Sequence, residues 1–144
     1  MIYTKMTKVA LKLCFDAHKD QTDKSGMPYV FHPFHLAEQM KDEATTIVAL
    51  LHDVVEDTDY TIEDLRKMGF SEEVLEAITL MTHAPEVPYM DYVARVKTNP
   101  IARAVKLADL NHNSDSTRLE VLTEFDLRRE EKYKKAILLL ESED

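Results

Sequence analysis

Residues 50–61 read LLHDVVEDTDYT, where a run of apolar residues passes into a cluster of acids. Plotted at about 100° per residue, the segment from 45 to 57 places its large apolar side chains on one arc. These side chains are Ile47, Val48, Leu50, Leu51, Val54 and Val55. The opposite arc carries His52, Asp53, Glu56 and Asp57. The pattern predicts an amphipathic helix over residues 43–56, with one face for packing and the other for chemistry.

The rest of the sequence has the composition and the cap signals of a helical protein. Of its 144 residues only 2 are glycine and 5 are proline, while 44% are hydrophobic. This composition leaves little material for hairpins or for glycine-rich phosphate loops. Apolar periodicity and capping residues predict further helices at residues 3–18, 33–40, 62–68, 72–82, 90–97, 100–113 and 127–140. We therefore expect an all-α fold, with residues 1–144 forming one domain.

Charge and composition exclude several classes of function. The formal net charge is −9, and an acidic surface opposes binding to a nucleic-acid polymer, which needs a basic face. Lysines interrupt the apolar residues near the N-terminus, so no segment is predicted to be a signal peptide or a membrane span. The single cysteine, Cys14, is expected to be a buried thiol. We expect a cytoplasmic protein, of unspecified oligomeric state, whose partner is a small anionic molecule.

The acids of residues 50–61 repel one another in the predicted helix. Asp53 stands three residues before Glu56 and four before Asp57, and each such like-charged pair destabilises a helix by about 0.2–0.5 kcal/mol. Carboxylates at a helix C-terminus also face the negative end of its dipole, which brings the total to roughly 1–3 kcal/mol. A cation bound by these carboxylates would make the cluster stabilising instead of destabilising. A solvated helix end and a metal site both fit this cluster.

Two residues elsewhere favour the metal site. His32 precedes a proline, so we expect its backbone to be extended and its side chain to be presented at a helix start. Asp109 lies on an apolar helix, where a buried carboxylate without a partner would cost several kcal/mol. Together with His52 and Asp53, these residues make a mixed nitrogen and oxygen site with open positions. Such a site suits Mn²⁺ or Fe²⁺ better than a closed zinc site.

Three motifs follow one another in the order of a known family. They are KSGMPYVFHP at 24–33, ALLHDVVEDT at 49–58 and VKLADLNHN at 105–113. The chain thereby resembles the HD-domain metal-dependent phosphohydrolases, and among them the hydrolase domain of Rel/SpoT-type alarmone enzymes and the stand-alone small alarmone hydrolases. The resemblance implies an HD-type helical domain. It also implies that Mn²⁺ supports removal of the 3′-pyrophosphate of guanosine tetra- or pentaphosphate (ppGpp or pppGpp).

The resemblance also implies a role for particular residues. The implied metal ligands are His32, His52, Asp53 and Asp109. The acid pair that handles the attacking water corresponds to Glu56 and Asp57, one of them acting as general base. The implied substrate contacts are Lys24, Ser25 and Asn113. A bound metal would lower the pKa of its water towards about 7, while Lys24 and Lys106 would neutralise phosphate charge.

The sequence departs from the family pattern at two positions. Asp23 and Asp115 stand where the family commonly has arginine, which replaces a cation by an anion near the expected polyphosphate or base. Two alternatives therefore stay open: an HD hydrolase of another nucleotide or phosphoester, and a catalytically silent nucleotide-binding module. Glu56 and Asp57 argue against the silent module, because binding alone needs no water-activating pair.

The remaining polar aromatic residues receive no catalytic role from the sequence. His18, His83 and His112 are expected to be structural, because nothing at their spacing completes another site. His35 is expected on a helix surface, and Tyr29 is expected to support the preceding loop by packing.

Overall fold

The computed structural model describes residues 1–143, and helices account for most of them. Their order along the chain is α1 (Lys5–His18), α2 (Phe31–Glu38), α3 (Glu43–Leu51), α4 (Val54–Asp57), α5 (Ile62–Lys67), α6 (Glu72–Met81), α7 (Tyr89–Lys97), α8 (Pro100–Asn113), the short 3-10 helix η1 (Ser116–Arg118) and α9 (Glu124–Glu141). Within residues 1–143 no strand forms, apart from an isolated bridge between Thr22 and Pro28. The expected all-α fold is confirmed.

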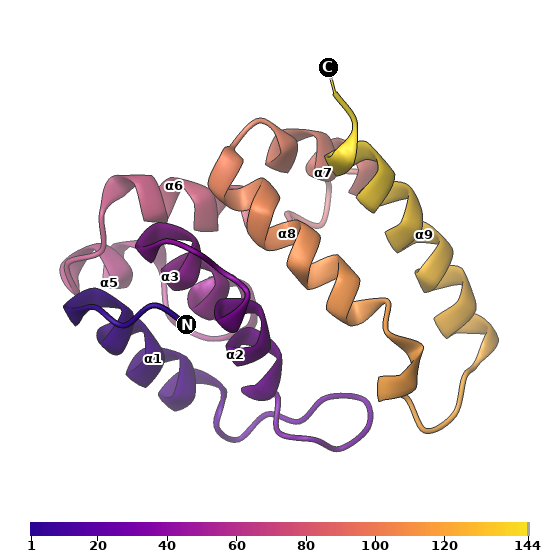
Figure 1. The fold of residues 1–144 in the computed structure, drawn as a ribbon, viewed down its shortest axis with the longest axis horizontal. Coiled ribbons are helices and arrows are strands. Elements are labelled where there is room, and N and C mark those ends of the chain that lie inside the picture. The colour runs from indigo at the N-terminus through magenta and orange to yellow at the C-terminus, as the bar shows by residue number, and fades with distance from the viewer. Residues whose placement is uncertain (144) are drawn as a thin grey trace.

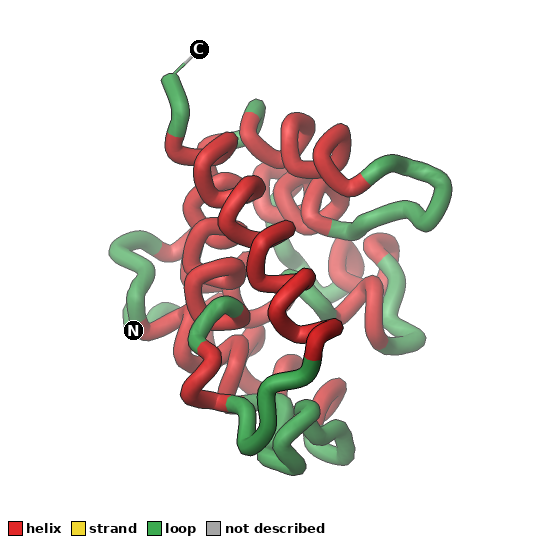
Figure 2. The backbone as a smooth tube through the Cα atoms, turned by 90° about the vertical axis from the view of Figure 1, so that its right-hand side faces the viewer, coloured by secondary structure: helices red, strands yellow, loops and turns green. Residues whose placement is uncertain are grey.

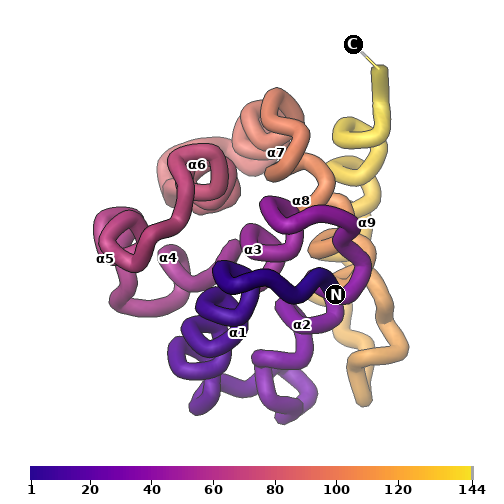
Figure 3. The backbone as a smooth tube through the Cα atoms, turned by 60° about the vertical axis from the view of Figure 1, so that its left-hand side comes forward, coloured from indigo at the N-terminus to yellow at the C-terminus, as the bar shows by residue number. Residues whose placement is uncertain are grey.

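Helix α3 forms the centre of the core. All of its residues from Thr45 to Leu51 are buried, because the run IVALL is apolar on every side of the helix. It packs against α1, α2, α6 and α8, and Figures 1 and 3 show these helices around it. Cys14 of α1 is part of the same core and is a buried free thiol, as expected.

The prediction of one continuous helix over residues 43–56 is wrong, because the helix is interrupted at His52 and Asp53. Helix α3 ends at Leu51, and α4 is a separate single turn. The His52 ring nitrogen Nδ1 lies 2.7 Å from the carbonyl oxygen of Ala49, the acceptor that a continuing helix would offer to the amide of residue 53. The acids therefore do not end a long helix, and the dipole penalty expected for them does not apply.

Helix α2 begins at Phe31, two residues before the predicted start at Pro33. His32 is consequently inside the helix and buried, and the expectation of an extended backbone there is wrong. The amide of His32 donates to the carbonyl of Tyr29 at 3.0 Å. Pro33 is the third helical residue, and the missing N–H matters little there because the first four amides of a helix have no intrahelical acceptor.

Most of the predicted caps are present. Thr61 and Asp64 form a capping box before α5, Ser71 caps α6, and Asn99 caps α8 in front of Pro100. Asp126 does not open α9 as predicted. Thr123 is the N-cap and Asp126 completes its capping box from the third helical position, so the helix begins at Glu124.

Two loop segments lie side by side at one end of the molecule. Residues 19–30 connect α1 to α2, and residues 114–123 connect α8 to α9. Figure 1 shows them approaching one another at the bottom of the view, and Figure 2 shows the same end as a cluster of loops. The Ser25 hydroxyl donates to the carbonyl of Arg118 at 2.5 Å, which joins the two segments directly.

No helix in residues 1–143 combines the length and the apolar character needed to cross a bilayer.

Candidate metal centre and its two pockets

Helices α2, α3 and α8 bring three of the predicted ligands into one buried cluster. His32 Nε2 lies 2.8 Å from Asp109 Oδ1, and His52 Nε2 lies 3.6 Å from the same oxygen. One donor atom from each of the three residues lies within 4.8 Å of the other two. Asp53 stands at the edge of this cluster, with its Oδ2 atom 3.0 Å from His52 Nε2. Three of the four residues form one cluster, with Asp53 beside it, although they come from α2, from α8 and from the break between α3 and α4.

His52 has the donor atom that a metal would use. Because Nδ1 donates to the carbonyl of Ala49, a neutral His52 ring keeps its lone pair on Nε2. Burial lowers the pKa of His52, but Asp53 and Asp109 raise it well above its usual value, and a metal held by the same carboxylates would take the place of the Nε2 proton. Nε2 is buried and makes no hydrogen bond of acceptable geometry within residues 1–143. A buried polar atom without a partner is costly. The donor set and this unpaired nitrogen fit a divalent cation.

Asp109 is held ionised by its neighbours on α8. Lys106 Nζ lies 2.9 Å from Oδ2, and the Asn113 side-chain amide donates to Oδ1 at 3.0 Å. Burial alone would raise the pKa of Asp109, but Lys106 and the two imidazoles hold it well below its usual range. The partner expected for this carboxylate is therefore supplied within one turn of the same helix.

His112 and Tyr29 contact the cluster in ways that the sequence analysis did not predict. His112 Nδ1 lies 2.7 Å from His32 Nδ1, and the two rings stack at 5.0 Å. Burial, aided by Arg118, lowers the pKa of His112 to about 4, so the neutral ring can accept the Nδ1 proton of His32, and a bound metal would replace the proton between His32 Nε2 and Asp109. The Tyr29 hydroxyl donates to the carboxylate of Asp53. The spacing of His112 three residues after Asp109 is the signal that could have indicated its contact.

Glu56 and Asp57, the predicted water-handling pair, have different surroundings. Glu56 lines a hollow of about 210 Å³ together with Asp53 and Asp109. Its Oε1 atom accepts from the amide of His83 at 3.1 Å, and burial raises its pKa above the usual value. Burial and the nearby Asp53 also raise the pKa of Asp57, whose carbonyl accepts from Gln21 at 3.4 Å. Of the two acids, the structure places Glu56 in the hollow.

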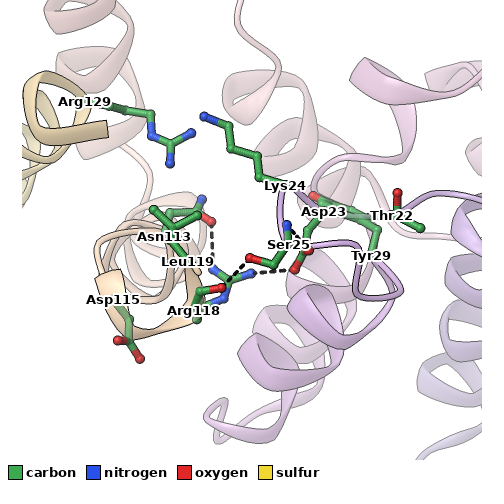
Figure 4. Close-up of a pocket in the computed structure, with 10 residues that line it drawn as sticks. All are labelled: Thr22, Asp23, Lys24, Ser25, Tyr29, Asn113, Asp115, Arg118, Leu119 and Arg129. Atoms are coloured by element: carbon green, nitrogen blue, oxygen red, sulfur yellow. Dashed lines mark hydrogen bonds and ion pairs between the residues drawn. The ribbon is translucent and has the colours of Figure 1, made fainter. Parts of the chain in front are cut away.

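A second hollow, of about 260 Å³, collects the predicted substrate contacts (Figure 4). Its lining includes Lys24, Ser25 and Asn113. Asn113 also lines the first hollow and binds Asp109, so it joins the second hollow to the one that contains the candidate metal centre. In Figure 4 the Lys24 and Arg129 side chains converge above the pocket, and each lies 3.5 Å from a carboxylate oxygen of Asp126.

Comparison with known proteins is consistent with this geometry. The sequence model of a family described as "HD domain" matches residues 10–121. The chain belongs to the HD-domain family. It is 36% identical over 137 residues to a "GTP pyrophosphokinase" of Streptomyces coelicolor, covering 86% of this chain and 15% of that protein. It is 33% identical over 125 residues to the "Bifunctional (p)ppGpp synthase/hydrolase SpoT" of Escherichia coli, covering 76% of this chain and 18% of that protein.

A solved structure supports the fold of this HD domain. It is described as "A metazoan ortholog of SpoT hydrolyzes ppGpp and plays a role in starvation responses", and it superposes with a TM-score of 0.79 at 23% identity. The superposition covers 99% of this chain and 89% of that chain. The HD-type resemblance predicted from the three motifs is thus confirmed, while the chain spans less than a fifth of the two curated relatives named above.

Proposed function

We propose that the protein is a metal-dependent phosphohydrolase that removes the 3′-pyrophosphate of guanosine tetra- or pentaphosphate. The observation that carries this proposal is the buried cluster of His32, His52 and Asp109, with an unpaired His52 nitrogen, beside a polar hollow that Asp53, Glu56 and Asp109 line. The relatives support the substrate, because the names of the Escherichia coli protein and of the metazoan structure both refer to ppGpp hydrolysis.

His32, His52, Asp53 and Asp109 would hold the metal. Their mixed nitrogen and oxygen donors suit Mn²⁺, which we propose as the ion, or Fe²⁺. When bound, such an ion supplies Lewis acidity, which polarises a phosphoryl oxygen and acidifies water. His112 fixes the ring of His32 through their short contact, so that Nε2 faces the site.

The remaining chemistry belongs to side chains in the first hollow. Glu56 acts as general base and takes a proton from the attacking water, for which its raised pKa is favourable. Water adds to the phosphorus attached to the 3′ oxygen, and the bond between that oxygen and that phosphorus breaks. The 3′ oxygen takes up a proton, which gives GDP or GTP and pyrophosphate. Lys106 and Lys132 line the same hollow and offset phosphate charge.

The second hollow would then receive the nucleoside end of the substrate. Lys24, Ser25 and Asn113 line it, and Asn113 connects it to Asp109. Asp23 in the same lining supports an alternative, an HD hydrolase of another nucleotide or phosphoester, because an anion stands where the family commonly has arginine.

A turnover panel tests the proposal. Purified protein loaded with Mn²⁺ is offered ppGpp, pppGpp and a series of nucleoside mono-, di- and triphosphates, and product release is followed for each. We expect pyrophosphate release from the two alarmones and loss of that release in Glu56→Gln. Turnover of other nucleotides alone would replace the substrate assignment by the alternative. Ligand binding without any turnover would indicate the silent module.

A further inference from the structure

Arg118, which the sequence analysis did not single out, joins the two loop segments around the second hollow. Its Nη2 atom lies 3.7 Å from Asp23 Oδ2, and its carbonyl accepts the Ser25 hydroxyl. Its Nη1 atom donates to the carbonyl of His112 at 3.0 Å and to Asn113 Oδ1 at 3.3 Å. Figure 4 shows the guanidinium between Asn113 and Asp23, beneath the space that Lys24 and Arg129 cover from above.

Asp23 is engaged by this arrangement and is not a free anion facing the substrate. Its Oδ1 atom accepts from the amides of Ser25 at 2.8 Å and Met27 at 3.0 Å, while Oδ2 faces Arg118. Asp115 also lines the hollow, and its carboxylate accepts from the amide and the hydroxyl of Thr117. Neither acid at an arginine position is therefore a free carboxylate, and Arg118 balances the charge of Asp23.

The contacts of Arg118 determine where Lys24 lies. Lys24 stands between Asp23 and Ser25, and both of these neighbours bind Arg118. The loop closes on itself through backbone hydrogen bonds between Asp23 and Met27 and between Gln21 and Tyr29, so the contacts of Arg118 fix it against the opposite segment. The Asp23 and Arg118 side chains are 22% and 26% exposed, and their pair joins two loop segments outside the hydrophobic core. Breaking the pair should therefore affect the pocket more than the fold.

We propose that Arg118 is a positioning and specificity-determining residue: paired with Asp23, it fixes the substrate loop and supplies, from the opposite wall, a cation for the nucleoside end of an anionic nucleotide. This inference rests on the proposed function. The groups assigned to metal binding and water activation lie on α2, on α8 and between α3 and the end of α4, and Arg118 reaches them only through His112 and Asn113. Loss of the pair should accordingly raise KM for ppGpp and leave kcat nearly unchanged, as expected for an interaction made equally in the ground and transition states.

A charge series at position 118 tests the proposal. Arg118→Asp places a carboxylate beside Asp23, whereas Arg118→Lys keeps a cation there, and Asp23 keeps its bonds to the amides of Ser25 and Met27 in both variants. With Mn²⁺-loaded protein we expect KM for ppGpp to rise roughly five- to tenfold in Arg118→Asp and to rise less in Arg118→Lys. Arg95→Asp, at an exposed arginine of α7, is the matched control and should leave KM unchanged. An unchanged KM in Arg118→Asp, or an equal rise in Arg95→Asp, would overturn the proposal.

Hydrogen exchange provides a readout that does not depend on turnover. The amides of Ser25 and Met27, which bind Asp23, should exchange faster in Arg118→Asp and keep most of their protection in Arg118→Lys. Unchanged exchange in Arg118→Asp would contradict the positioning role whatever the substrate is. Absence of ppGpp turnover by the wild-type protein would overturn the proposed function instead, and the exchange data would still decide whether Arg118 holds the loop.

Discussion

The candidate metal centre and the pocket beside it are built in different ways. The centre consists of residues in or between core helices that are almost fully buried, with His32 at 3%, His52 at 2% and Asp109 at 5% exposure. The pocket rim comes from the loops at 19–30 and 114–123, and ion pairs of 3.5–3.7 Å hold it. Core packing fixes the metal centre, whereas the pocket rim is held by the ion pairs and hydrogen bonds of its own residues. Substitutions should abolish chemistry at the centre and change affinity gradually at the rim.

The largest effect is expected for His52→Gln. The substitution removes the unpaired donor atom, and with it the several kcal/mol of transition-state stabilisation that a catalytic metal supplies. Turnover of ppGpp should fall on the order of 10³-fold or more, and elemental analysis of the purified variant should find the metal content reduced. Glu38→Gln, at the exposed last residue of α2, is the control. Equal metal content and turnover in both variants would show that the buried cluster is not the metal centre.

The next largest loss of activity is expected at Glu56, and it should distinguish this residue from Asp57. Glu56→Gln should lower kcat roughly 10²- to 10⁴-fold with the metal retained, because Glu56 lines the hollow next to Asp53. Asp57→Asn should have a smaller effect, since the structure places this side chain outside that lining. Single-turnover kinetics on Mn²⁺-loaded variants would measure both. The opposite order would assign the base to Asp57.

The sequence predicts most reliably those structural features that depend on residues close together in the chain, such as helix caps. The caps at Thr61, Ser71 and Asn99 are side-chain bonds to amides two or three residues ahead, so a short window contains all the information. The partners of Asp109 are predictable for the same reason, because Lys106 and Asn113 lie within one turn of the same helix.

The sequence predicts poorly those features that depend on contacts between distant residues, or on a side chain that competes with the backbone for a hydrogen bond. The break after α3 depends on the His52 ring binding a backbone carbonyl, which the helical periodicity of residues 45–57 does not indicate. The contact between Ser25 and Arg118 joins residues 93 positions apart. Arg118 was therefore missed, while the acid at position 23 was treated as an unpaired anion.

Metal removal should lower the stability of the whole domain by a modest amount. The loss should depend on the residues of the metal centre and not on those of the pocket rim. An ion that binds only the folded protein at a hundredfold above its Kd adds about 2.7 kcal/mol, or roughly 5–10 °C in the melting temperature of a domain of this size. Chelation of the Mn²⁺-loaded protein should lower the melting temperature by this amount. The same treatment should have no effect on His52→Gln, and a rim variant such as Arg118→Asp should respond as the wild type does.

The smallest effect is expected at the rim, in Asp126→Asn. Hydrogen bonds from Thr123 lower the pKa of Asp126 below its usual value of 3.8, so the unfolded chain binds the proton more tightly than the folded protein. The stabilisation is therefore complete above the unfolded pKa and is lost as the pH falls through the folded pKa.

Urea unfolding over a pH series measures this contribution. Asp126→Asn should be slightly less stable than the wild type at pH 7, and the difference should shrink below about pH 4. Glu124→Gln is the matched control, because it removes a charge from the same first turn of α9 without touching the bonds to Thr123. A difference that persists unchanged at low pH would mean that packing, and not these charge-assisted bonds, fixes the residue that holds Lys24 and Arg129. The rim would then resemble the metal centre in its construction.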